Sequence, residues 1–121
     1  MVEHRTLIKS FQYASEGIWF AVKYNQNLRL HLLAAVFVVI LSIIFKVGAF
    51  EMGILGVMIL LVICTEMINT SIEEMTNLIT KEHRAEAKIA KDVSAGMVLL
   101  TSVGSVIVGI LVFFPYILKL F

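Results

Sequence analysis

Charged residues, cysteine and proline are all scarce in this sequence. Lys, Arg, Asp and Glu make up 16% of the 121 residues, and there is one cysteine and one proline. A soluble domain has about 25% charged residues, whereas this chain is 60% hydrophobic. One cysteine excludes an internal disulfide. The net charge of +1 argues against nucleic acid as a partner, because no basic stripe is present to neutralise phosphates. The composition predicts a small integral membrane protein.

The motifs of several enzyme classes are also missing. The sequence contains no G-x-x-x-x-G-K-[ST] and no strand–glycine loop–helix unit, so no recognised soluble nucleotide-binding fold is expected. No G-x-S-x-G motif or Cys/His pair indicates acyl chemistry. His4 and His31 have no partners at metal-ligand spacing, so zinc is not expected.

Three apolar runs approach the roughly 20 residues that a membrane-spanning helix needs. They cover about 29–50, 52–76 and 92–116, and we expect helices because lipid leaves backbone polar groups no other partner. Lys46, Gly48 and Glu51 predict a short turn between the first two spans, and Pro115 predicts the end of the third. The expected fold is all-α, with residues 1–121 forming a single membrane domain.

Positive charge is distributed unevenly between the two ends of these spans. Arg5, Lys9, Lys23 and Arg29 precede the first span, and Lys81, Arg84, Lys88 and Lys91 separate the second from the third. The positive-inside rule therefore places the N-terminus and the 77–91 segment in the cytoplasm.

Residues of about 5–26 have the pattern of an amphipathic helix. Its apolar residues recur at steps of three or four and so share one face: Leu7, Phe11, Ala14, Ile18 and Val22. Trp19 suits the headgroup level of a membrane. The helix is expected to lie on the membrane surface, and packing against the bundle is an equally acceptable interpretation.

Small residues repeat along the third span. Thr101, Ser105 and Gly109 recur every four residues with Gly104 beside them, a pattern that allows close helix packing. Three helices have little surface with which to enclose a polar site, so we expect a homo-oligomer.

A polar face interrupts the second span. Glu66, Asn69, Glu73 and Asn77 fall within about 60° of one another on a helix. Glu66 and Glu73 are about 10 Å apart along the axis, so they are expected to have separate roles. The deeper Glu66 suits a proton acceptor, and Glu73 suits a divalent cation bound with nucleotide phosphates.

Two further polar clusters have simpler interpretations. Lys88 and Lys91 commonly extend toward the headgroups at a span boundary, but Asp92 gains nothing from that position and could pair with them or help to bind a nucleotide. The segment "KYNQNLRLH" (23–31) could be a solvated collar. From the residues alone, the carboxylate site could move protons or drugs, or catalyse a reaction on a lipid headgroup.

Motifs across nearly the whole chain resemble those of the prokaryotic diacylglycerol kinase family, which includes undecaprenol kinases. The pattern E-x-x-N-[TS]-x-I-E at 66–73 is followed by a short basic loop and "AKD" at 90–92. "FQYASEG" (11–17) and "NLRLH" (27–31) add to the resemblance.

The resemblance implies a kinase that uses ATP and Mg²⁺ to phosphorylate a lipid alcohol, either diacylglycerol or undecaprenol. It also implies a homotrimer in the bacterial cytoplasmic (inner) membrane, with sites shared between subunits at the cytoplasmic face. Glu66 is similar in position to the general base, Asn69 to the residue orienting it, and Glu73 to the metal ligand. The implied ATP contacts are Tyr13, Glu73, Glu82, His83, Arg84, Lys91 and Asp92, and the implied lipid contacts are Glu66, Ala95, Asn27 and Arg29.

Two positions depart from the family pattern. Asn25 stands where the family has a glutamate that is a second metal ligand, and Asn77 stands where it has an aspartate. An amide oxygen can bind Mg²⁺ but brings no charge, so weaker metal binding is expected. A weakened, non-enzymatic scaffold of the same fold and a small proton-coupled drug transporter are the alternatives.

Overall fold

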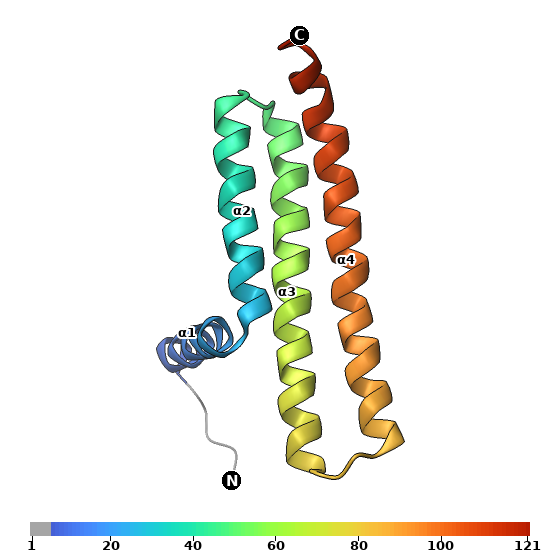
Figure 1. Ribbon diagram of the computed structural model, residues 1–121. Helices are drawn as coiled ribbons and strands as arrows, with labels where there is room; N and C mark the ends of the chain where they lie inside the picture. The colour runs from blue at the N-terminus through green and yellow to red at the C-terminus, as the bar shows by residue number, and fades with distance from the viewer. Residues whose placement is uncertain (1–5) are drawn as a thin grey trace.

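The computed structural model describes residues 6–121, which form four α-helices and no strand (Figure 1). Helices α2 (Gln26–Ile44), α3 (Ala49–Ile79) and α4 (Ala85–Leu118) run side by side with α3 in the middle. Helix α1 (Leu7–Tyr24) extends sideways from the start of α2. The predicted all-α fold is confirmed. His4 and Arg5, which entered the predictions, lie outside the described residues.

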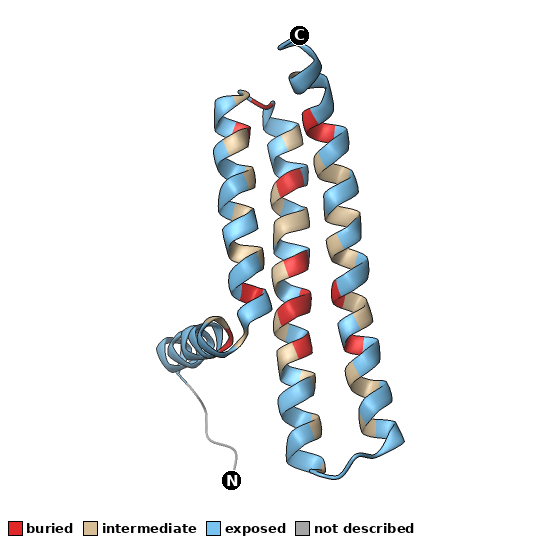
Figure 2. Cartoon of the chain, viewed as in Figure 1, coloured by how far each residue is buried: buried red, intermediate tan, exposed pale blue. Residues whose placement is uncertain are grey.

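The three helices that lie side by side have the dimensions of membrane spans. They contain 19, 31 and 34 residues, which corresponds to about 28, 46 and 51 Å, against a hydrocarbon core of about 30 Å. Their outer faces are exposed and apolar, as at Leu33, Leu60 and Leu100 (Figure 2). The three predicted spans are therefore confirmed as helices long and apolar enough to cross a bilayer, and α3 and α4 extend beyond it.

The turn between α2 and α3 differs from the prediction. Helix α2 ends at Ile44 and not near Phe50, because Lys46 adopts a positive φ of 51° that a helix does not accommodate. Glu51, which was predicted to belong to the connection between the spans, lies in the first helical turn of α3. Because apolar residues continue through this turn, the prediction from hydropathy alone placed the end of the first span too far along the chain.

Helix α4 continues through Pro115 to Leu118, beyond the end that was predicted near Pro115. A proline this close to the C-terminus removes one backbone hydrogen bond. The following residue is held by tertiary contacts, since the Tyr116 hydroxyl donates to Glu51 Oε1 (3.2 Å) and accepts from the Gly48 N–H (3.2 Å). Phe113 packs with the turn residue Val47 in the buried cluster beneath them.

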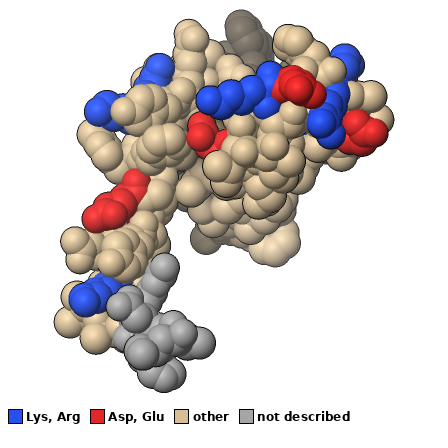
Figure 3. All heavy atoms as spheres, turned by 90° about the horizontal axis from the view of Figure 1, so that it is seen from below, with Lys and Arg blue, Asp and Glu red and all other residues tan. Residues whose placement is uncertain are grey.

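The connection between α3 and α4 is also shorter than expected. Only residues 80–84 lie between the helices, so most of the predicted 77–91 loop is helical. This loop lies at the same end of the molecule as α1 (Figure 1). Lys and Arg side chains are visible over this end, together with Asp and Glu (Figure 3), and the cytoplasmic orientation stays a prediction.

Thr6 caps the N-terminus of helix α1, and its hydroxyl accepts from the Lys9 N–H at 3.3 Å. Its predicted apolar face is open, with Leu7 and Phe11 both about two-thirds or more exposed, and only Ala21 near its C-terminus is buried. Within one chain, the bundle therefore covers just the end of α1, and the position of α1 on the membrane surface stays a prediction.

Close packing of α4 against α3 is confirmed at two of the small residues. The Thr101 and Thr65 hydroxyls lie 3.0 Å apart across the interface. A Cβ at Gly104 would lie 3.8 Å from the Met58 side chain, so this glycine faces α3 at contact distance.

Candidate active site

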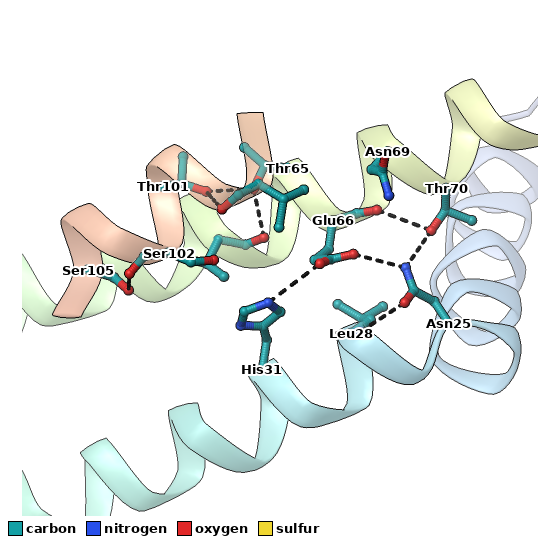
Figure 4. Close-up of polar contacts among 12 residues, drawn as sticks. Asn25, Leu28, His31, Thr65, Glu66, Asn69, Thr70, Thr101, Ser102 and Ser105 are labelled. Atoms are coloured by element: carbon teal, nitrogen blue, oxygen red, sulfur yellow. Dashed lines mark hydrogen bonds and ion pairs between the residues drawn. The ribbon is translucent and has the colours of Figure 1, made fainter. Parts of the chain in front are cut away.

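Buried polar side chains gather around the middle of α3, where the start of α2 and the first part of α4 pack against it. Glu66 is 2% exposed, and Asn69 and Ser94 are 8% and 2% exposed. A charged group in a membrane span costs at least a few kcal/mol unless polar partners surround it. The contacts of Glu66 supply such partners (Figure 4).

The Glu66 carboxylate is held between α3 and α2. Asn25 Nδ2 donates to Glu66 Oε2 at 3.1 Å, and His31 Nε2 lies 3.4 Å from Glu66 Oε1. Each carboxylate oxygen thus has one nitrogen beside it (Figure 4). The acid is therefore buried between the two helices.

Asn25 joins three helices. Its backbone N–H donates to Ala21 O (2.9 Å) at the end of α1, and its Oδ1 accepts from the Leu28 N–H (3.0 Å) at the start of α2. Its Nδ2 reaches α3, where it donates to Glu66 and to Thr70 Oγ1 at 2.7 Å. Leu28 beside it is 1% exposed and Asn25 itself is half-buried, so the junction is partly enclosed.

The predicted polar face of α3 divides between its two neighbours. Asn69 turns toward α4, where its Oδ1 accepts from Ser94 Oγ at 2.6 Å, and its Nδ2 donates to Glu73 Oε1 at 3.3 Å. One turn further along, Asn77 Oδ1 accepts from Lys91 Nζ at 2.8 Å. Glu73 is exposed while Asn69 is buried, so this series leads from the interior to water.

Replacing Ser94 with alanine tests whether that hydroxyl positions Asn69. The variant leaves the buried Asn69 Oδ1 without its donor, so we expect a loss of stability of about 1 kcal/mol, typical of one hydrogen bond. Thermal unfolding in detergent micelles would measure it. Ser71→Ala is the control, because the Ser71 hydroxyl bonds only to Met67 O of its own helix among the described residues. Equal unfolding midpoints for the two variants would contradict the prediction.

Most of the predicted ATP contacts line one cavity at the 80–84 end of the molecule. Its volume is ≈ 740 Å³, and the predicted residues that line it are Glu82, His83, Arg84, Lys91 and Asp92. Lys88 is paired with Asp92 there, and Arg84 Nε lies 3.5 Å from Glu82 Oε2. The mixture of cations and carboxylates suits a polyphosphate accompanied by a metal.

The remaining predicted contacts are more scattered. Glu73 and Asn27 line a smaller cavity of ≈ 270 Å³ beside Asn25. Tyr13 lies on α1 and Ala95 is exposed on α4, and neither lines the large cavity. In this single chain, the structure therefore does not bring all the predicted nucleotide and lipid contacts together.

Arg29, predicted to contact lipid, has a structural role. Its Nη1 donates to Val22 O (2.9 Å) and Lys23 O (2.6 Å) in the last turn of α1. A cation at a helix C-terminus satisfies carbonyls that lack helical partners, so Arg29 helps to fix the angle between α1 and α2.

Three residues of the candidate site were not predicted from the sequence: His31, Thr70 and Ser94. Thr70 had a local signal, because it follows Glu66 by one helical turn. His31 and Ser94 belong to other helices, and their contacts arise only on folding. His31 also lines an apolar groove of ≈ 440 Å³ along α2, α3 and α4, so it contacts both the groove and the buried acid.

The acidic residues set a limit on how a metal can bind. Among residues 6–121, no group of three or more His, Cys, Asp or Glu side chains could hold a metal ion. Glu73 is exposed at the end of the polar series and can offer carboxylate oxygen. Mg²⁺ commonly binds through one or two carboxylates and substrate phosphates, so Glu73 fits a metal that arrives with a nucleotide.

Comparison with known proteins identifies the family. The family model described as prokaryotic diacylglycerol kinase matches residues 12–113. The chain belongs to the prokaryotic diacylglycerol kinase family. It is 36% identical over 113 residues to the undecaprenol kinase of Bacillus subtilis (strain 168), covering 93% of this chain and 92% of that protein.

A second relative is longer than this chain. The diacylglycerol kinase of Synechocystis sp. is 34% identical over 115 residues, which cover 94% of this chain and 66% of that protein. The family match and both names support a membrane lipid kinase, and they favour neither a drug transporter nor any other non-kinase class.

Proposed function

We propose that this member of the diacylglycerol kinase family transfers the γ-phosphate of ATP to the hydroxyl of a membrane lipid alcohol. The observation that carries the proposal is the position of Glu66. It is buried, its oxygens are held by Asn25 and His31, and His31 also lines the apolar groove. An oily alcohol that places its chain in this groove would bring its hydroxyl to the acid.

In the proposed reaction, Glu66 accepts the proton of the lipid hydroxyl. The lipid oxygen forms a bond to the γ-phosphorus as the bond from that phosphorus to the β–γ bridging oxygen breaks, and ADP leaves. Phosphoryl transfer depends mainly on positioning and charge neutralisation. Asn69, held by Ser94 and bonded to Glu73, would position the Glu73 carboxylate.

The nucleotide would bind in the cavity beside the 80–84 loop, where Lys91 and Arg84 offer positive charge. Mg²⁺ at Glu73 would supply neutralisation of the phosphate charge. We assign the metal to Glu73 and not to Asn25, whose side-chain oxygen accepts from the Leu28 N–H. Tyr13 on α1 remains a proposed nucleotide contact.

We further propose a homotrimer in the bacterial cytoplasmic membrane, with the N-terminus and the 80–84 loop in the cytoplasm. The apolar groove between α2 and α4 and the separation of Tyr13 and Ala95 from the main cavity support sites completed by a neighbouring subunit.

The test measures labelled γ-phosphate transfer from ATP to undecaprenol and to diacylglycerol in mixed micelles. We expect transfer to both, with the higher kcat/KM for undecaprenol, because the undecaprenol kinase relative matches over nearly its full length. Preference for diacylglycerol would reverse the acceptor assignment. No transfer to either lipid would reject the proposal and favour the non-enzymatic scaffold.

A further inference from the structure

We infer that Asn25 is a positioning residue that holds the Glu66 carboxylate through its amide N–H groups, and is not a metal ligand. The inference rests on the proposed function, because the held carboxylate is the proposed base. It differs from the expectation raised by the family pattern, in which this position binds metal.

The orientation of the Asn25 amide follows from its hydrogen bonds. A backbone N–H can only donate, so the side-chain atom 3.0 Å from the Leu28 N must be the oxygen. The NH₂ group therefore faces α3. Its neighbours there are Glu66 Oε2 at 3.1 Å and Thr70 Oγ1 at 2.7 Å, both of which can accept. All three contacts agree on one orientation.

The same geometry disfavours a cation at Asn25. The amide oxygen lies at the N-terminus of α2, where unpaired N–H groups produce a partial positive charge. The side facing Glu66 presents N–H groups, which repel a cation. These N–H groups supply positive partial charge next to the buried acid, so the Glu66 carboxylate has a hydrogen-bond donor at this side without a metal.

Asn25 is also the link between the acid and the rest of the fold. It ends α1, caps α2 and contacts α3. Because aspartate caps helices as well as asparagine does, the capping role and the positioning role can be separated by one substitution. Asn25→Asp keeps the oxygen that accepts from Leu28 and replaces the N–H donors with a carboxylate oxygen.

The two roles of Asn25 predict opposite results for Asn25→Asp. A positioning role predicts that kcat for lipid phosphorylation falls about tenfold or more, while the KM for ATP and the magnesium concentration for half-maximal rate stay within twofold. A metal-ligand role predicts a lower magnesium requirement with kcat retained, since the variant offers a charged oxygen. A wild-type kcat or a lowered magnesium requirement would overturn the inference.

A double-mutant cycle tests the contact independently of activity. Thermal unfolding of the full chain in micelles would compare Asn25→Asp, Glu66→Gln and the double variant. We expect Asn25→Asp to lower the midpoint by several degrees through repulsion of Glu66, and Glu66→Gln to remove most of that loss, because contacting residues are coupled. An equal loss in both backgrounds would overturn the inference.

Gln12→Glu provides the control, because it adds one negative charge at an exposed position on α1 and should leave the unfolding midpoint unchanged. If the wild-type protein transfers no phosphate, the proposed function fails, and the cycle still decides whether Asn25 holds Glu66.

Discussion

Glu66→Gln is expected to reduce kcat for lipid phosphorylation by about 10²–10⁴-fold, the usual contribution of a general base. Glutamine keeps the size of the side chain and an oxygen that can accept from Asn25 Nδ2, now 3.1 Å from Glu66 Oε2. It cannot accept the hydroxyl proton at neutral pH. Transfer of labelled phosphate in mixed micelles measures the loss, and the KM for ATP should change little because Glu66 does not line the nucleotide cavity.

The control for this variant is Glu86→Gln, which removes an exposed carboxylate in the first turn of α4. It should retain at least half the wild-type rate. If Glu66→Gln kept a comparable rate, the assignment of the base would be wrong, and some other group would have to accept the proton.

Glu73→Gln is expected to raise the magnesium concentration for half-maximal rate by about tenfold or more. Loss of an outer-shell partner already weakens metal binding about 10–100-fold, and loss of a ligand should have at least that effect. The effect should be large because the described residues contain no cluster of three metal-ligating side chains that could substitute. Initial rates across a magnesium titration at saturating ATP provide the measurement.

The two carboxylate variants should respond differently to added metal. High magnesium should restore a substantial part of the rate of Glu73→Gln and none of the rate of Glu66→Gln, because only Glu73 is proposed to act through the cation. An unshifted magnesium curve for Glu73→Gln, equal to that of Glu86→Gln, would remove Glu73 from the metal site.

The spans could be predicted because lipid imposes a minimum apolar length on any helix that crosses it. Their ends could not, because helix termini depend on backbone geometry and tertiary contacts as well as on hydropathy. Lys46 ends a helix within an apolar stretch by adopting a positive φ. Tyr116 lies beyond a proline and is nevertheless helical, since its hydroxyl is anchored to Glu51.

From helical periodicity alone, the candidate site was predictable on one helix only. Helical periodicity placed Glu66, Asn69 and Glu73 on one side of α3, but it contains no information about the neighbouring helices. The partners of Glu66 are 41 and 35 positions away in sequence, at Asn25 and His31, and Ser94 is 25 positions from Asn69. Such contacts are set by how the helices pack, and a periodic pattern cannot supply them.

The junction at Asn25 couples a surface event to a buried one. Helix α1 presents Phe11 and Trp19 outward, and its last residue precedes Asn25, whose amide holds Glu66. A tilt of α1 would move the Asn25 amide relative to the Glu66 carboxylate. A force on α1 would be shared between the contact of Asn25 with Glu66 and the Arg29 contacts that hold α1 against α2.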